Sequence, residues 1–106
     1  MVTYRVVKED VDGFAGEAIL YRLSEPVTYE VLDDETYERH GGKTEYVVAS
    51  AVVAPFSGTE TLVFPADKEG NVLSWLDLAG VKVWDHELAM SKLVEYVEEQ
   101  KEKQDE

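Results

Sequence analysis

Residues Tyr46–Ala54 have the sequence YVVASAVVA, the core of the longest apolar run in the chain. Both alternating faces of this run are apolar, and four of its nine members are β-branched valines. Such a run is typical of a strand in the middle of a sheet that is covered on both sides. Pro55 ends the run. We therefore expect a sheet built around Tyr46–Ala54.

Upstream, the apolar pattern predicts more strands separated by short breaks. Val2–Lys8 alternates, with Val2, Tyr4 and Val6 on one face. Ala18–Leu23 and Val27–Val31 are further candidates, and Ser24-Glu25-Pro26 separates them. Strands this close together along the chain favour an antiparallel meander.

Downstream, three further runs are candidate strands: Thr61–Phe64, Val72–Leu76 and Val81–Trp84. Asp, Gly and Asn within Ala66–Asn71 are residues that hairpin turns use, because Gly and Asn tolerate positive φ. We therefore predict a curved antiparallel sheet of about five to six strands, connected as a meander and hairpins.

From Asp85 the apolar period changes to that of a helix. Met90, Leu93 and Val97 recur at helical spacing. Asp85 suits the N-cap position, and Glu87 lies in the first turn, where the helix dipole favours a negative charge. We predict one C-terminal amphipathic helix, from about His86 to Gln100, packed on the sheet. The chain is then a single α+β domain over residues 1–100, with 101–106 as a polar tail that frays.

The composition restricts the classes of partner. The 106 residues include 23 acidic and 10 basic side chains, for a formal net charge of −13. Binding to DNA, RNA or an anionic membrane needs a basic surface, so we expect none of these as a direct partner. A basic protein partner is compatible with the charge, because complementary fields speed encounter. The simpler interpretation, favoured on charge alone, is that the acidic surface serves solubility.

The sequence favours a cytoplasmic location. It contains no cysteine, which excludes disulfides and thiolate chemistry and suits a reducing compartment. Met1–Asp10 lacks the basic and then apolar segments of a signal peptide. The run Tyr46–Phe56 is too short to cross a bilayer.

No catalytic residue, cofactor or metal site is predicted. His40 and His86 lack the surrounding set of ligands that a hydrolytic metal centre uses. Asp67–Asn71 resembles part of a calcium loop but has no downstream glutamate at the required distance. Gly41–Thr44 resembles the end of a phosphate-binding loop, but the upstream glycine is missing.

Five residues are candidates for contact with a partner. Asp33, Asp34, Glu35 and Glu38 lie in Asp33–Thr44, which we expect to be an exposed loop because it is polar and contains Gly41-Gly42. Trp84 is a candidate exposed anchor, although packing against the core at the start of the helix is an alternative. The other aromatic residues at strand positions are expected to fill the core: Tyr4, Tyr21, Tyr29, Tyr46, Phe64 and Trp75.

Several segments together carry a resemblance to known proteins: Tyr4–Val7, Tyr21–Pro26, Thr44–Ser50, Pro55–Thr61, Phe64–Asp67, Gly70–Trp75 and Asp85–Ala89. They cover most of residues 1–89, and the chain resembles a group of small proteins encoded by actinobacterial phages, mycobacteriophages among them. It departs from that group at Val81–Trp84, where the group has a Ser/Arg/Gly-rich connection. The resemblance implies no assigned activity and no catalytic residues.

The leading hypothesis is a non-enzymatic phage accessory protein. It would bind a host or phage protein in the bacterial cytoplasm through its acidic surface, for example by imitating the phosphates of DNA. One alternative is a structural or assembly protein of the virion. Another is a small enzyme whose site has no recognisable pattern. The oligomeric state is left open.

Overall fold

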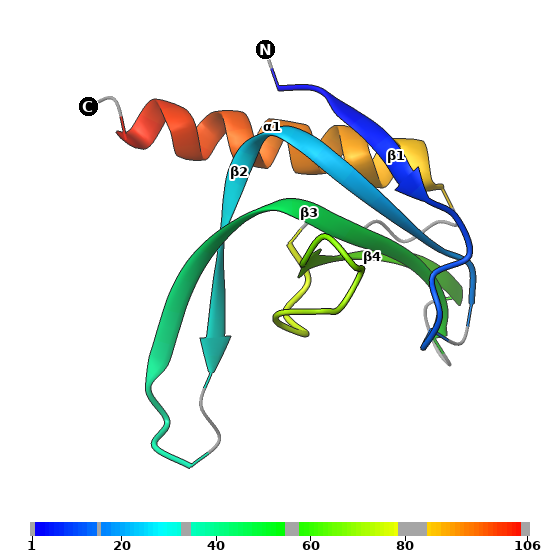
Figure 1. Ribbon diagram of the computed structural model, residues 1–106, viewed down its shortest axis with the longest axis horizontal. Coiled ribbons are helices and arrows are strands. Elements are labelled where there is room, and N and C mark those ends of the chain that lie inside the picture. Colours follow the sequence, from blue (N-terminus) through cyan, green and yellow to red (C-terminus); the bar gives the residue numbers. More distant parts are fainter. Residues whose placement is uncertain (1, 15, 33–34, 55–57, 79–84, 105–106) are drawn as a thin grey trace.

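The computed structural model describes residues 2–14, 16–32, 35–54, 58–78 and 85–104. These residues form four strands and one helix: β1 Tyr4–Lys8, β2 Ala18–Leu32, β3 Arg39–Ala54, β4 Gly58–Ala66 and α1 His86–Gln104. The sheet is antiparallel with the order β1-β2-β3-β4, and α1 crosses one of its faces (Figure 1). The α+β class with a C-terminal helix is confirmed, but the described residues form four strands instead of five to six.

The strand predicted to lie in the middle of the sheet does so. β3 pairs with β2 on one side and with β4 on the other. Val47, Val48 and Ala49 follow one another along β3, and all three are fully buried. Since successive side chains of a strand point to opposite faces, both faces of the sheet are covered at this position.

Ser24-Glu25-Pro26 does not separate two strands as we expected. β2 runs continuously from Ala18 to Leu32, and its pairing with β3 shifts register between Arg22 and Val27. Pro lacks an amide hydrogen and is therefore tolerated at such an irregularity. The break in the sequence bends one long strand and does not end it.

The expected exposed loop Asp33–Thr44 was too long. Arg39–Thr44 belongs to β3 and pairs with Val27–Leu32 of β2. Gly42 lies opposite Tyr29, and a β-carbon at Gly42 would lie 2.6 Å from the Tyr29 hydroxyl oxygen. The glycine therefore makes room for an aromatic ring across the ladder, and does not mark a loop.

The two paired segments Val27–Leu32 and Arg39–Thr44 form what we call the arm. β1 pairs with β2 only as far as Leu23, and β4 pairs with β3 only from Tyr46 onward. The arm is therefore a two-stranded extension of the sheet, and it projects from the body of the molecule in Figure 1. Its base is held by the amide of Thr28, which donates to the Gln100 side chain at 3.2 Å.

The helix begins and packs as predicted. Asp85 is the N-cap, because its Oδ1 accepts a hydrogen bond from the Leu88 amide at 3.0 Å. Met90, Leu93 and Val97 are buried against a core that includes Tyr21, Leu23, Val47 and Val63. The helix continues to Gln104, four residues past the expected end, so residues 101–104 are helical. Lys101 forms an ion pair of 2.7 Å with Glu25 in the bend of β2.

The other face of the sheet is covered by two irregular segments. Its buried residues are Val11, Ala18, Leu20, Val48 and Ala66. The turn after β1 contributes Val11 and Phe14, and Gly70 of the segment after β4 lies close to Val11 and Leu20. The expected strand Val72–Leu76 is reduced to a single bridge between Ala66 and Val72. The expected strand Val81–Trp84 lies outside the described residues.

The packing of α1 predicts a large difference between two leucines of the same helix. Leu93 is fully buried, whereas Leu88 is 41% exposed. Leu93→Ala should lower the free energy of unfolding by about 2–5 kcal/mol, because it leaves a cavity against the sheet. Leu88→Ala should lower it by less than about 1 kcal/mol. Chemical denaturation measures both, and equal losses would contradict this packing.

The environment of Tyr21 predicts a loss of stability at alkaline pH. Burial raises the pKa of Tyr21 above the ordinary 10.0, and the neighbouring Tyr4, Glu17, Glu87 and Glu9 raise it further. The stabilising contribution is complete below pH 10.0 and is lost as the pH rises toward the folded-state pKa, because only the unfolded chain releases the proton there.

The melting temperature, measured from about pH 8 to about pH 11, should therefore fall less steeply in Tyr21→Phe than in the parent. Tyr37→Phe is the control, because Tyr37 is 81% exposed. Identical slopes for the parent and Tyr21→Phe would contradict the argument.

Candidate protein-binding surface

The five residues predicted to contact a partner are placed only in part. Glu35 and Glu38 are exposed and lie at the end of the arm. Between them, Tyr37 is 81% exposed and has a φ of 57°. Asp33, Asp34 and Trp84 lie outside the described residues, so their contribution stays a prediction.

The arm is not uniformly acidic. Its paired segments also carry His40 and Lys43, both exposed, and Arg39 begins β3. Basic residues therefore follow Glu35 and Glu38 closely in the sequence, which weakens the field that a basic partner would meet. The end of the arm therefore offers the exposed ring of Tyr37 and the described carboxylates of Glu35 and Glu38.

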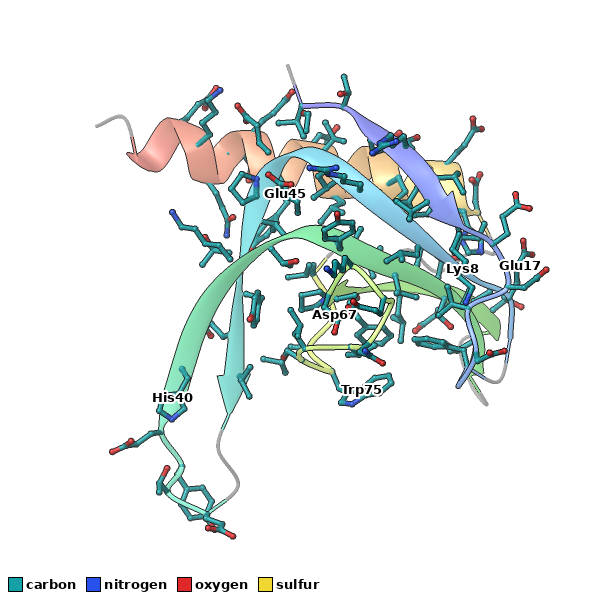
Figure 2. The ribbon with its side chains drawn as sticks, in the orientation of Figure 1. Lys8, Glu17, His40, Glu45, Asp67 and Trp75 are labelled. Carbon is teal, nitrogen blue, oxygen red and sulfur yellow. The ribbon has the colours of Figure 1, made fainter. Side chains whose placement is uncertain are left out.

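The largest departure from the predicted core is Trp75, which we expected to be buried. It is 67% exposed. Its ring contacts Phe64 at a centroid distance of 5.2 Å and Phe14 at 5.9 Å. Figure 2 shows its side chain pointing away from the body of the sheet. We call Trp75, Phe14 and Phe64 the aromatic patch.

Asp67 positions the segment that carries Trp75. Its Oδ1 accepts hydrogen bonds from the amides of Glu69 at 3.0 Å and Asn71 at 2.9 Å, and its Oδ2 accepts one from the Asn71 side chain. These hydrogen bonds, chiefly those from Asn71, hold the pKa of Asp67 below the ordinary 3.8. The turn that was compared with a calcium loop is thus closed by its own amides.

Beyond this turn, the segment is fastened to the sheet at three points. The Leu73 amide donates to the Pro65 carbonyl at 2.8 Å, and the Leu78 amide donates to the Val63 carbonyl at 2.8 Å. The Ser74 hydroxyl donates to the Glu30 carbonyl of the arm at 2.6 Å. Trp75 therefore has its backbone fixed on both sides while its ring remains exposed.

An acidic turn adjoins the aromatic patch. Glu9, Asp10, Asp12 and Glu17 are all exposed, and residues 9–17 contain no lysine or arginine. We call residues 9–17, which carry these four carboxylates, the acidic turn. It is joined to the aromatic patch by Phe14, which belongs to the same turn and contacts Trp75. The two turns also meet where Gly70, with a φ of 90°, packs against Val11.

The local sequence explains the shape of the acidic turn. Asp10 and Gly13 adopt positive φ values of 55° and 95°, which Asp and Gly tolerate best. The Val11 amide donates to the Ala18 carbonyl and the Ala51 amide donates to the Glu17 carbonyl, both at 3.0 Å. The turn is thereby tied to β2 and β3, and its carboxylates stay in solvent.

The aromatic patch and the acidic turn together suit recognition of a protein. Tryptophan is enriched among the residues that contribute most to protein interfaces, and a ring fixed before binding loses little entropy. A cationic side chain over an exposed indole face, with carboxylates nearby, gains a cation–π interaction and a favourable field. Sequence reasoning missed Trp75 because its apolar neighbours resemble a strand.

The described part of the chain contains no group of three or more His, Cys, Asp and Glu side chains that could hold a metal ion. None of its helices is long and apolar enough to cross a membrane. The compared family models, curated proteins and solved structures contain no match to this chain.

The role of Asp67 predicts a change in the surroundings of Trp75. In a Trp84→Phe background, so that Trp75 is the only indole, Asp67→Ala should shift the fluorescence of Trp75 and increase its quenching by iodide. The contribution of ionised Asp67 to the stability of the turn is present above pH 3.8 and is lost as the pH falls through the lower folded-state pKa. Asp67→Asn should remove that acid transition. Unchanged quenching in Asp67→Ala would show that the turn does not position the ring.

Proposed function

We propose that the chain is a non-enzymatic phage accessory protein that binds a basic protein in the bacterial cytoplasm. The observation that carries the proposal is the exposed ring of Trp75, held on Phe64 and Phe14 beside the acidic turn. A solvent-exposed tryptophan with a fixed backbone suits an interface, and solubility does not require one. The resemblance to phage proteins supports the cellular setting.

The acidic surface acts in this proposal mainly on the rate of encounter. A net charge of −13 attracts a basic partner from a distance and is screened by salt. The aromatic patch then supplies most of the short-range binding energy, because burial of a large ring against an apolar pocket is favourable at any salt concentration. Affinity and association rate should therefore depend on different residues.

The test is a pull-down with the tagged chain from an actinobacterial lysate, followed by binding kinetics with each protein recovered. Trp75→Ala should weaken binding about thirtyfold or more, which is the scale of truncating a tryptophan at the centre of an interface. Tyr37→Ala is the matched control, since it removes an exposed aromatic ring from the end of the arm. A partner lost with Tyr37→Ala and retained with Trp75→Ala would move the interface to the arm.

A second comparison separates the two acidic surfaces at equal charge. One variant neutralises the acidic turn with Glu9→Gln, Asp10→Asn, Asp12→Asn and Glu17→Gln. The other neutralises the four acidic residues between Asp33 and Glu38 with Asp33→Asn, Asp34→Asn, Glu35→Gln and Glu38→Gln. Both remove four negative charges, so a general effect of net charge cancels. The first should slow association more and flatten its salt dependence more. Melting temperatures should change little, because exposed charges contribute little to stability.

A further inference from the structure

The two edges of the sheet differ in whether another strand can join them. Along β4, the Leu73 and Leu78 amides donate to the Pro65 and Val63 carbonyls, and Asp77 Oδ1 accepts from the Val63 amide at 2.9 Å. Pro65 has no amide hydrogen to offer. The segment after β4 thus occupies that edge. β1 is the other edge, and no other described segment pairs with its outer side.

The register of β1 shows which of its backbone groups face outward. The Thr3 carbonyl accepts a hydrogen bond of 2.8 Å from the Ser24 amide, so the backbone of Thr3 faces β2. In an antiparallel pair these groups alternate in direction from residue to residue. The amides and carbonyls of Tyr4 and Val6 therefore point away from the sheet, toward solvent. Tyr4 and Val6 are themselves 37% and 50% exposed.

A groove flanks β1 on each face, and the two grooves differ in character. On the helix side, a hollow of about 320 Å³ is lined by Val2, Thr3 and Tyr4 of the N-terminal segment and by Ser91 and Val94 of α1. On the opposite side, a hollow of about 300 Å³ includes Arg5, Arg22 and Glu45. A strand placed beside β1 would direct its alternate side chains to these two sides.

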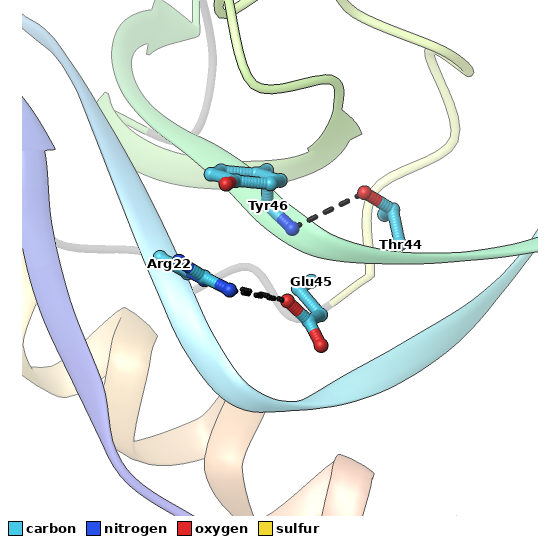
Figure 3. Close-up of polar contacts among 4 residues, drawn as sticks. All are labelled: Arg22, Thr44, Glu45 and Tyr46. Atoms are coloured by element: carbon cyan, nitrogen blue, oxygen red, sulfur yellow. Dashed lines mark hydrogen bonds and ion pairs between the residues drawn. The ribbon is translucent and has the colours of Figure 1, made fainter.

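The charges on the second side indicate what the added strand carries. Arg22 is occupied: its Nη2 lies 3.1 Å from Glu45 Oε2, and its guanidinium lies over the ring of Tyr46 (Figure 3). Arg5 lies opposite Arg22 on β2, is exposed, and forms no ion pair with any residue that the structure describes. Two arginines side by side favour an acidic neighbour, and like charges directly across strands are unfavourable.

We propose that the β1 edge binds an extended peptide segment of a partner protein, in which apolar residues alternate with an acidic residue opposite Arg5. The backbone of the segment pairs with Tyr4 and Val6, its apolar side chains fill the groove between β1 and α1, and its carboxylate contacts Arg5. A second copy of this chain fits less well, because it would bring Arg5 and Lys8 to the edge from both sides. Each copy also carries a net charge of −13.

The probe is a fluorescein-labelled peptide of sequence SVEVEVS, measured by fluorescence anisotropy with the full chain. Its control, SVKVKVS, should bind at least fivefold more weakly despite the acidic net charge of the protein. Arg5→Glu should weaken binding of SVEVEVS about fivefold or more, whereas Lys43→Glu, the same change of charge on the arm, should not. Preference for SVKVKVS would overturn the proposal, since it would mean that net charge and not Arg5 selects the peptide.

The backbone pairing is tested without altering the protein. N-methylation of the valine amides of the peptide should abolish binding, because these amides face β1. N-methylation of the glutamate amides, which face solvent, should weaken binding by less than about threefold. Equal effects of the two methylation patterns would contradict strand addition.

Two further outcomes separate this proposal from the proposed function and from pairing of two copies of the chain. Trp75→Ala should leave SVEVEVS binding unchanged, so the peptide result and the proposed function can fail independently. Sedimentation of the chain alone should show a monomer. A dimer that Val6→Pro disrupts would mean that a second copy, and not an acidic peptide, occupies the β1 edge.

Discussion

Val47, Val48 and Ala49 are consecutive on β3 and all fully buried, which requires the sheet to be covered on both faces at once. A chain of 106 residues with a single described helix has only one regular element to supply that cover. α1 packs on one face through Met90, Leu93 and Val97. The second face must therefore be covered by irregular segments. This requirement explains both the aromatic patch and the difference between the two edges of the sheet.

The second face receives two turns that come from distant parts of the chain. The acidic turn contributes Val11 and Phe14, and the Asp67 turn contributes Gly70 and the segment leading to Trp75. Turns cover a sheet less completely than a helix does, because a helix pairs its own backbone N–H and C=O groups, whereas unpaired groups of a turn must stay in contact with water. An aromatic ring therefore ends as the outermost layer of the core, with one side in solvent. The aromatic patch is a product of how the second face is covered.

The same segments determine which edge of the sheet is occupied by another part of the chain. The chain after β4 runs along that edge and accepts or donates hydrogen bonds at Val63 and Pro65. No described segment does this for β1, whose five residues are all exposed. The charged side chain of Lys8 and the register shift between Val6 and Lys8 limit non-specific pairing of other strands with that edge. What stays available is a short stretch at Tyr4–Val6, flanked by two grooves of different polarity.

Local patterns in the sequence were sufficient for the elements whose cause is local. The N-cap at Asp85, the buried side of α1 and the central position of Tyr46–Ala54 follow from hydrogen-bonding capacity and apolar period, and all three are confirmed. The tertiary structure decided the rest, because cross-strand pairing overrides local signals. Gly41-Gly42 and Pro26 resemble breaks, yet Tyr29 packs over Gly42 and the strand bends at the proline. The apolar neighbours of Trp75 in the sequence predict a core position. In the structure, the Asp67 turn and Ser74 fix its backbone at the surface, and these contacts are not encoded in the apolar periodicity.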